Sequence, residues 1–201
     1  MPLLLVLLLV ALAAAPASAD WRYAPPPAGA VVTYSDGRVS RIDSVVGEAI
    51  VVVEMLDGVV EETNYRTWLL RVRLARQDRP GEIMMETAAQ TAILELWPLQ
   101  AGESLAYGYQ ALQGGQMAII GQVVLSYGGE ETLQLEAGIL RAHRVVRDYV
   151  YTETATGREF RGTQTTWHET ATGLILQVSW DSEGPLGKDS GIYQATKIEL
   201  P

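Results

Sequence analysis

The stretch that decides the fold is TGLILQVSWD, residues 172–181. Its first two residues, Thr172 and Gly173, are typical of a turn, because glycine readily adopts a positive φ angle. Apolar side chains then occupy every second position, at Leu174, Leu176, Val178 and Trp180. A period of two is typical of a β-strand with one buried face. We therefore predict a strand that directs these four side chains to the interior.

The same pattern extends over most of the chain. Apolar residues alternate at 68–74 and at 132–136, and turn signals such as Asp57-Gly58 and Gly114-Gly115 separate the runs. Both dipeptides favour tight hairpins. The regular spacing of such turns predicts an all-β protein, a single antiparallel meander that curls into a barrel or half-barrel. We place this β domain at residues 30–201.

One segment breaks the pattern. Between Ile83 and Leu96, apolar residues recur at intervals of three and four, which is typical of an amphipathic helix. Trp97-Pro98 would end such a helix, because proline lacks the N–H that the helix needs. We predict one short helix at Thr87–Leu96, and we hypothesise that Met84–Leu96 covers an open end of the sheet as a lid.

The first nineteen residues predict export. They carry no charged side chain, Leu3–Ala15 is a continuous apolar run, and Ala17-x-Ala19 fits a signal-peptidase site. We expect cleavage between Ala19 and Asp20, a Pro-rich arm at residues 20–29, and a soluble periplasmic or secreted protein that does not span the membrane. Two alternatives stay open: an uncleaved membrane anchor, or a true start upstream, since no lysine or arginine precedes the apolar run.

The composition argues against several classes of function. A formal net charge of −9 disfavours nucleic acid, which calls for a basic surface. The chain has no cysteine, so it has no thiolate nucleophile, no thiolate metal site and no cysteine for a lipid anchor at the predicted mature N-terminus. Its stability must come from packing rather than from disulfides.

Candidate catalytic groups are few. His143 and His168 are the only histidines, and the chain has no Gly-x-Ser-x-Gly elbow and no phosphate-binding glycine loop. His168 precedes Glu169, but neighbours on a strand point to opposite faces, which argues against a catalytic dyad. We expect no catalytic residue, no cofactor and no metal site, and we interpret both histidines as structural.

A basic concentration lies in one part of the sequence. It contains Arg141, Arg144 and Arg147, with Arg158 and Arg161 beyond the next turn. Alternation places Arg141 and Arg147 on one strand face with His143. The arginines would either pair with glutamates across strands or bind an anionic headgroup, since a guanidinium matches carboxylate and phosphate.

Tryptophan is frequent for a chain with one phenylalanine. Trp68 and Trp180 lie on the apolar faces of their predicted strands. Packing in a filled core is one interpretation. A curved sheet that presents tryptophan, leucine and valine to an open concavity would instead bind a lipid or another hydrophobic ligand.

The sequence also contains an exact repeat. Glu153–Gly157 and Glu169–Gly173 both read Glu-Thr-Ala-Thr-Gly. Reuse of one turn is the simpler interpretation, because both glycines suit a positive φ angle. The alternative is a duplicated binding loop.

Several motifs resemble a family of exported bacterial all-β domains of unknown function. They are Leu96–Gly102, the turn Glu136-Ala137-Gly138, the segment from Thr166-Trp167 to Leu176, and the final Glu199-Leu200. The resemblance lies mainly in the C-terminal half. The resemblance implies localisation in the cell envelope and a curved antiparallel sheet. It implies no catalytic residue for this chain.

Two functions follow from these observations. The first is a non-catalytic periplasmic module that binds a hydrophobic envelope ligand in the curved sheet. For this function we take Arg141, Arg144, Arg147, Trp68 and Trp180 as the candidate ligand-binding residues. The second is an envelope module that contacts another protein and holds no small molecule.

Overall fold

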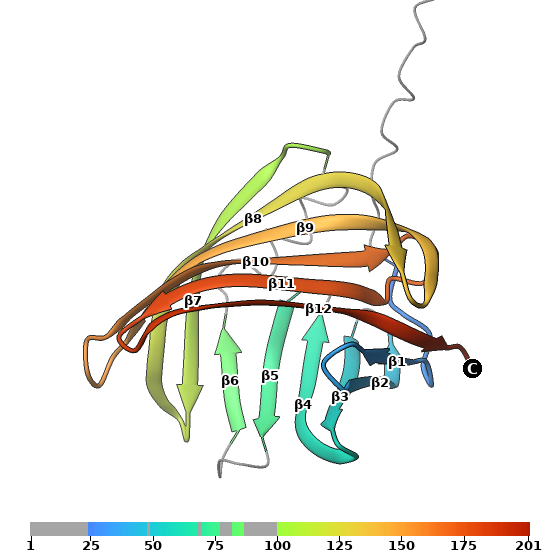
Figure 1. The fold of residues 1–201 in the computed structure, drawn as a ribbon. Coiled ribbons are helices and arrows are strands. Elements are labelled where there is room, and N and C mark those ends of the chain that lie inside the picture. The colour runs from blue at the N-terminus through green and yellow to red at the C-terminus, as the bar shows by residue number, and fades with distance from the viewer. Residues whose placement is uncertain (1–23, 48, 68–69, 77–81, 87–99) are drawn as a thin grey trace, which may run out of the picture.

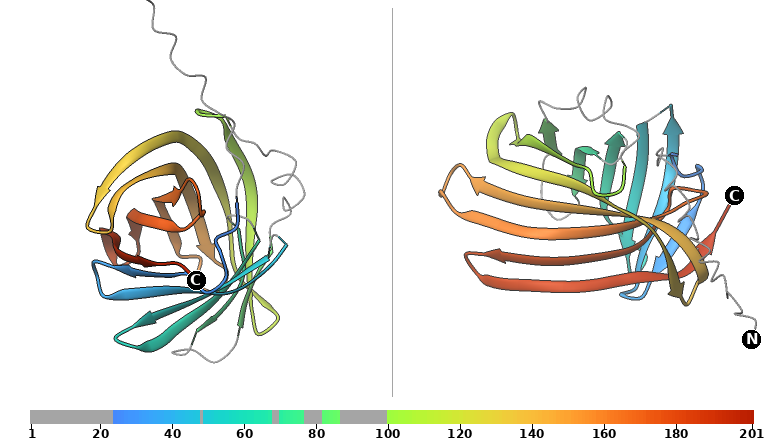
Figure 2. Two further views of the ribbon diagram at one scale, coloured as in Figure 1. Left: turned by 90° about the vertical axis from the view of Figure 1, so that its right-hand side faces the viewer. Right: turned by 90° about the horizontal axis from the view of Figure 1, so that it is seen from above.

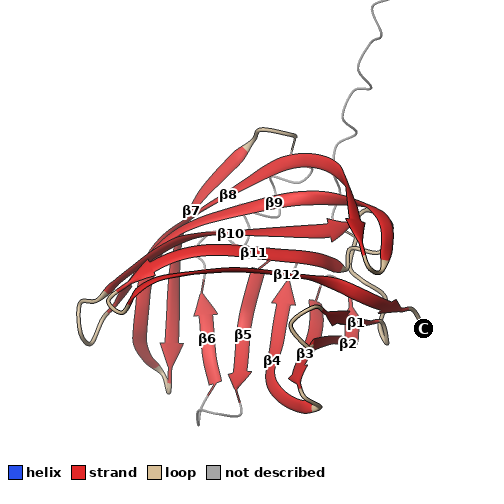
Figure 3. Ribbon diagram, viewed as in Figure 1, coloured by secondary structure: helices blue, strands red, loops and turns tan. Residues whose placement is uncertain are grey.

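The computed structural model describes residues 24–47, 49–67, 70–76, 82–86 and 100–201. All regular structure in these residues is β, as Figure 3 shows. The strands are β1 (Val31–Tyr34), β2 (Arg38–Val46), β3 (Ala49–Leu56), β4 (Val59–Thr67), β5 (Leu70–Arg76), β6 (Glu82–Glu86), β7 (Ser104–Gln113), β8 (Gln116–Leu135), β9 (Gly138–Glu153), β10 (Glu159–Glu169), β11 (Ile175–Gly184) and β12 (Gly187–Glu199).

The strands form one antiparallel meander. Each strand pairs with the next along the chain, and β1 pairs with both β2 and β12. The ladder of pairings therefore closes on itself, and Figure 2 shows the sheet curving around an interior. The predicted all-β antiparallel meander is confirmed.

The sheet has two walls that differ in strand direction. The long strands β9–β12 run crosswise to β3–β6, as Figure 1 shows. Strand β8 belongs to both regions, because it pairs with β7 along its first half and with β9 along most of its length. Its pairing with β9 is interrupted between Tyr127 and Glu130, where an irregularity increases the local bend. The crossing of the two walls leaves space between them.

The predicted hairpin turns are confirmed at two places. Asp57 and Gly58 alone connect β3 to β4, with φ angles of 52° and 77°. Gly114 and Gly115 connect β7 to β8 in the same way, with φ angles of 58° and 77°. Two successive positive φ angles define the turn whose twist matches that of the flanking strands.

The repeated pentapeptide forms the same turn twice. In each copy the glycine N–H donates to the glutamate carbonyl four residues earlier, at 2.8 Å, in the pairs Gly157–Glu153 and Gly173–Glu169. Both glycines have a positive φ, and the second threonine of each copy donates to the glutamate carboxylate. These bonds agree with reuse of one turn, at opposite ends of β10.

The alternation predicted for residues 174–181 is present in β11. Leu176 is fully buried and Val178 is 4% exposed, as expected. Trp180 is only half-buried, because it faces an open cavity. Trp68, which the sequence places on the apolar face of another strand, lies outside the described residues.

Other sequence predictions also fall outside the described residues. They include the short helix at Thr87–Leu96 and the cleavage site between Ala19 and Asp20. The first part of the supposed lid, Met84–Glu86, is described: it belongs to β6 and pairs with β7, so it is a piece of the wall. The described part of the chain contains no helix of a length and hydropathy suited to crossing a membrane.

Candidate ligand cavity

A cavity of about 540 Å³ lies between the two walls. Residues of β1–β4 and of β7–β12 line it. Buried hydrophobic clusters lie on both sides of it, one on β7–β9 around Val123 and Leu125, the other on β1–β3 around Val32 and Ile50. Val32, Ile50 and Leu125 of these clusters also line the cavity, so the cavity has a packed apolar wall on each side.

The lining is mixed in character. Aliphatic side chains such as Val52, Val145 and Val178 alternate with aromatic ones, which are Tyr34, Tyr107, Tyr109, Tyr151, Tyr193 and Trp180. Six charged side chains also reach the cavity, and they are Arg38, Glu54, Glu61, Glu62, Arg66 and Arg147. A site of this kind suits a ligand with both apolar and polar parts.

Arg147 on β9 lies among tyrosines. Its guanidinium carbon is 5.7 Å from the ring centroid of Tyr151 and 5.9 Å from those of Tyr109 and Tyr149. Its Nη2 donates a hydrogen bond to the hydroxyl of Tyr151. Such distances are those of cation–π contacts, in which a ring face stabilises the cation. We call Arg147, Tyr107, Tyr109, Tyr149 and Tyr151 the arginine–tyrosine cluster.

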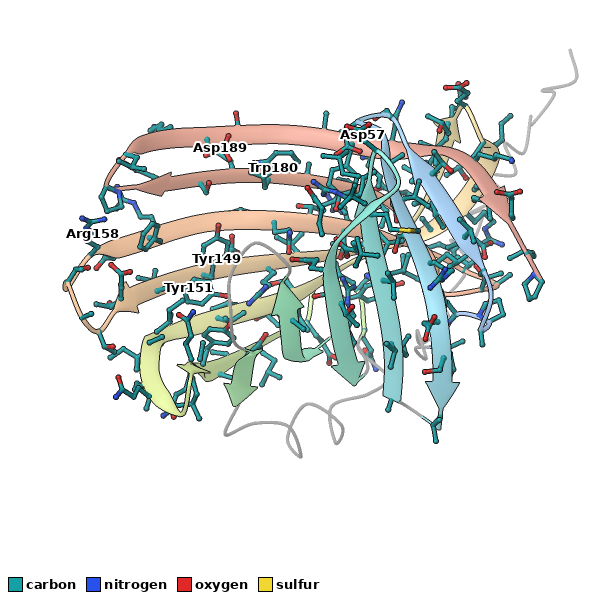
Figure 4. All side chains as sticks on the ribbon, turned by 90° about the horizontal axis from the view of Figure 1, so that it is seen from below. Asp57, Tyr149, Tyr151, Arg158, Trp180 and Asp189 are labelled. Carbon is teal, nitrogen blue, oxygen red and sulfur yellow. The ribbon has the colours of Figure 1, made fainter. Side chains whose placement is uncertain are left out.

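The strand register explains how two candidate residues reach the same cavity. Arg147 on β9 lies opposite Gln164 on β10, and Gln164 lies opposite Trp180 on β11. Figure 4 shows Tyr149 and Tyr151 on β9, with Trp180 two strands away. Trp180 covers Gly191 on β12, where a Cβ would meet its ring, and its Nε1 donates to Asp189 at 3.0 Å.

The opposite wall, formed by β2–β4, has its own charge pairs. Arg66 and Glu54 form an ion pair of 3.4 Å, with side chains 19% and 16% exposed. Arg38 lies over the ring of Tyr193 at 4.7 Å. On this wall, each arginine that lines the cavity has a carboxylate partner, since Arg38 also pairs with Asp36 at 3.6 Å.

Two buried histidines lie opposite each other on β9 and β10. The Nδ1 of His143 is 2.8 Å from the hydroxyl of Tyr127, and the Nε2 of His168 is 3.0 Å from the hydroxyl of Thr166. Burial lowers the pKa of both, that of His168 to about 3. The carboxylate of Glu169 instead accepts from the backbone and hydroxyl of Thr172, both at 2.6 Å.

These contacts place both histidines in structural hydrogen bonds. Within the described residues, no three histidine, aspartate or glutamate side chains gather closely enough to hold a metal ion.

The structure separates the arginines that the sequence groups together. Arg147 lines the cavity, whereas the side chain of Arg141 is 70% exposed and pairs with Glu130. Arg144 lies against Gly128 and donates to its carbonyl at 3.5 Å.

Two further arginines lie away from the cavity lining. Arg161 pairs with Glu183 across β10 and β11 at 2.8 Å, and Arg158 lies in the exposed β9–β10 turn (Figure 4). Four of the five arginines therefore lie outside the cavity lining, and two of these, Arg141 and Arg161, pair with glutamates. Trp68 lies outside the described residues.

Sequence reasoning missed the tyrosines. The signal was present, because Tyr107-Gly108-Tyr109 and Tyr149-Val150-Tyr151 both repeat tyrosine at a spacing of two. That spacing puts both rings of each pair on one face of a strand. What the sequence does not reveal is the register of β7, β8 and β9, which aligns Tyr109 and Tyr151 across β8 and brings the two pairs together.

Comparisons with known proteins identify a fold and no family. No family model matches the chain, and no curated protein does. The hypothetical lipoprotein YmcC of Escherichia coli matches with a TM-score of 0.50 and 12% identity, over 90% of this chain and 91% of that one. The match to YmcC shows that the two proteins share a fold.

Two other solved structures match less closely. A Bacteroides fragilis protein described as exported, with a YmcC-like fold, has a TM-score of 0.45 and 11% identity, over 89% of this chain and 99% of that one. A Parabacteroides distasonis protein named as a lipoprotein has a TM-score of 0.45 and 8% identity, over 87% of this chain and 97% of that one.

Proposed function

We propose that the protein is an exported, non-catalytic module that holds a hydrophobic or amphiphilic envelope molecule inside the curved sheet. The observation that carries this proposal is the cavity of about 540 Å³ between the two walls. Its volume falls within the range of about 300–1,000 Å³ that small-molecule sites occupy. Dry packing of both walls would not leave such a space, because protein interiors pack nearly as densely as organic crystals.

The lining favours an amphiphile over a purely polar ligand. Valine, isoleucine and leucine side chains from several strands face the same space as the tyrosines and Trp180. Apolar surface that a ligand removes from water contributes about 25 cal/mol per Å² before the costs of binding. The few charged groups would then orient the ligand rather than supply most of its affinity.

The predicted export to the cell envelope supports the proposal. The apolar first nineteen residues and the Ala17-x-Ala19 site are typical of exported proteins. YmcC, which has this fold, is named as a lipoprotein.

The experiment is to identify what purifies with the protein. The chain, with its N-terminal segment, is expressed in a bacterium and purified from the periplasm without detergent. An organic extract is analysed by mass spectrometry, and the stripped protein is titrated with fatty acids and phospholipids while tryptophan fluorescence is followed. We expect a lipid in the extract and a saturable fluorescence change.

A cavity-filling variant serves as the matched control. Gln164→Trp enlarges a side chain that lines the cavity, whereas Thr163→Trp changes its neighbour, which does not line it. Only the first should reduce the bound lipid. An extract free of lipid, together with no saturable change, would contradict the proposal and favour the module that contacts another envelope protein.

A further inference from the structure

Arg147 differs from the other arginines of the cavity in its charge balance. In the described part of the chain, Arg38 pairs with Asp36 and Arg66 pairs with Glu54, but Arg147 takes part in no ion pair. Its Nε is buried and has no hydrogen-bond partner among the described residues. A guanidinium has five N–H donors, and the hydrogen bonds of Arg147 to the hydroxyls of Tyr151 and Tyr107 leave the remaining donors, Nε among them, for a ligand.

We propose that Arg147 binds the anionic group of the ligand, a carboxylate or a phosphate, and thereby sets the ligand's orientation in the cavity. This inference rests on the proposed function, because it names the chemical class of the molecule held there. A guanidinium matches either anion with two parallel hydrogen bonds. An anion would also neutralise a charge that is costly to keep partly buried and unpaired.

The surroundings of Arg147 suit an anion. Burial raises the pKa of Tyr107 and of Tyr151, so both hydroxyls stay protonated at neutral pH and can donate hydrogen bonds. Val145, two residues before Arg147 on β9, is buried beside the same space. The apolar part of an amphiphile would therefore find aliphatic surface next to its bound headgroup.

The opposite wall favours the same orientation. It presents Glu54, Glu61 and Glu62 to the cavity against Arg38 and Arg66. Both arginines of that wall already have carboxylate partners, so they compete weakly with Arg147 for an anion. The charges of the two walls thus distinguish the two ends of an anionic amphiphile.

The test compares ligands that differ only in the headgroup. Stripped protein is titrated with dodecanoate, dodecyl phosphate and 1-dodecanol, and binding is followed by tryptophan fluorescence. We expect the two anions to bind at least about tenfold more tightly than the alcohol, as is typical of charge-assisted hydrogen bonds. Inorganic phosphate should not displace dodecanoate at equal concentration, because it has no chain to fill the cavity.

The variants isolate Arg147. R147Q should lose the preference for the anions and still bind 1-dodecanol, which also shows that its cavity is folded. R141Q removes the same charge from the exposed part of β9 and should keep the preference.

Three results would contradict either the role of Arg147 or the proposed function, and the three can be told apart. Equal binding of acid and alcohol, or an R147Q variant that still prefers the acid, would overturn this inference alone. Displacement of dodecanoate by inorganic phosphate would show that the site takes a free anion. Failure of all three amphiphiles to bind would overturn the proposed function itself.

Discussion

Tyr109 on β7 and Tyr151 on β9 contact each other across an intervening strand, with ring centroids 4.8 Å apart. Gly121 on β8 lies between them in the register, opposite both residues. A Cβ at Gly121 would lie 2.5 Å from Cδ1 of Tyr151 and would also meet the backbone of Val150. The missing side chain therefore lets the two rings meet over β8 and complete the arginine–tyrosine cluster.

Gly121→Ala should destabilise the protein and disturb the cluster. The added methyl group meets backbone as well as a ring, so it cannot be accommodated by a small side-chain rotation. We expect the free energy of unfolding to fall by about 1–3 kcal/mol, as in overpacked sites. Chemical denaturation measures this. Gly108→Ala is the control, because a Cβ at that position on β7 meets nothing within 4 Å. Equal effects of the two variants would contradict the role given to Gly121.

Stability should fall below about pH 6.5, the pKa of histidine in an unfolded chain. Burial lowers the pKa of His168 to about 3 in the folded protein. Between these values the unfolded chain binds more protons, so protonation favours unfolding as the pH falls. Above about pH 6.5, neither state is protonated and this contribution is constant. Denaturation curves across this range should show a loss of roughly 1.4 kcal/mol per pH unit from His168.

The variant His168→Gln isolates this effect. Glutamine cannot be protonated in this range, and it retains a polar group near the hydroxyl of Thr166. The difference in unfolding free energy between the two proteins should therefore change with pH below about 6.5 and stay constant above it. Parallel pH profiles would show that His168 titrates normally in the folded state.

Leu176→Ala should be strongly destabilising. Leu176 is fully buried near the start of β11, so truncation removes apolar contacts and leaves a void. The expected loss is about 2–5 kcal/mol. Leu186→Ala is the matched control, since Leu186 is fully exposed in the β11–β12 turn and its truncation should leave the unfolding midpoint unchanged. Similar losses in both variants would contradict the assigned interior face of β11.

Export should remove the first nineteen residues. We propose that the chain recovered from the periplasm begins at Asp20, after the Ala17-x-Ala19 site. Intact-mass analysis measures this directly. A mass that retains Met1, found in the membrane fraction, would favour the uncleaved anchor.

Local sequence patterns account for the strands and turns but not for the site. Alternation predicts buried Leu176 and Val178, and Asp57-Gly58 predicts its hairpin, because both depend only on neighbours in the chain. Alternation also predicts that Arg141 and Arg147 lie on the same face of one strand. It does not reveal that Arg141 lies where the face is exposed and Arg147 lies in the cavity.

The site depends on long-range strand register, and this is why local sequence patterns predict the strands and turns but not the site. The arginine–tyrosine cluster needs β7 and β9 aligned through β8 so that Gly121 lies opposite both Tyr109 and Tyr151. No local pattern specifies that alignment, because register depends on the bends and irregularities of the whole sheet.

The most direct test of the central claim is to locate a bound ligand by fluorine NMR. The five tryptophans are replaced biosynthetically by 5-fluorotryptophan, and Trp180→Phe and Trp167→Phe assign two of the resonances. Trp180 lines the cavity, whereas Trp167 does not and donates to Glu131 instead. If the cavity binds the ligand, dodecanoate will shift the Trp180 resonance saturably and leave that of Trp167 unchanged. A shift confined to Trp167, or no shift at either residue, would contradict the account.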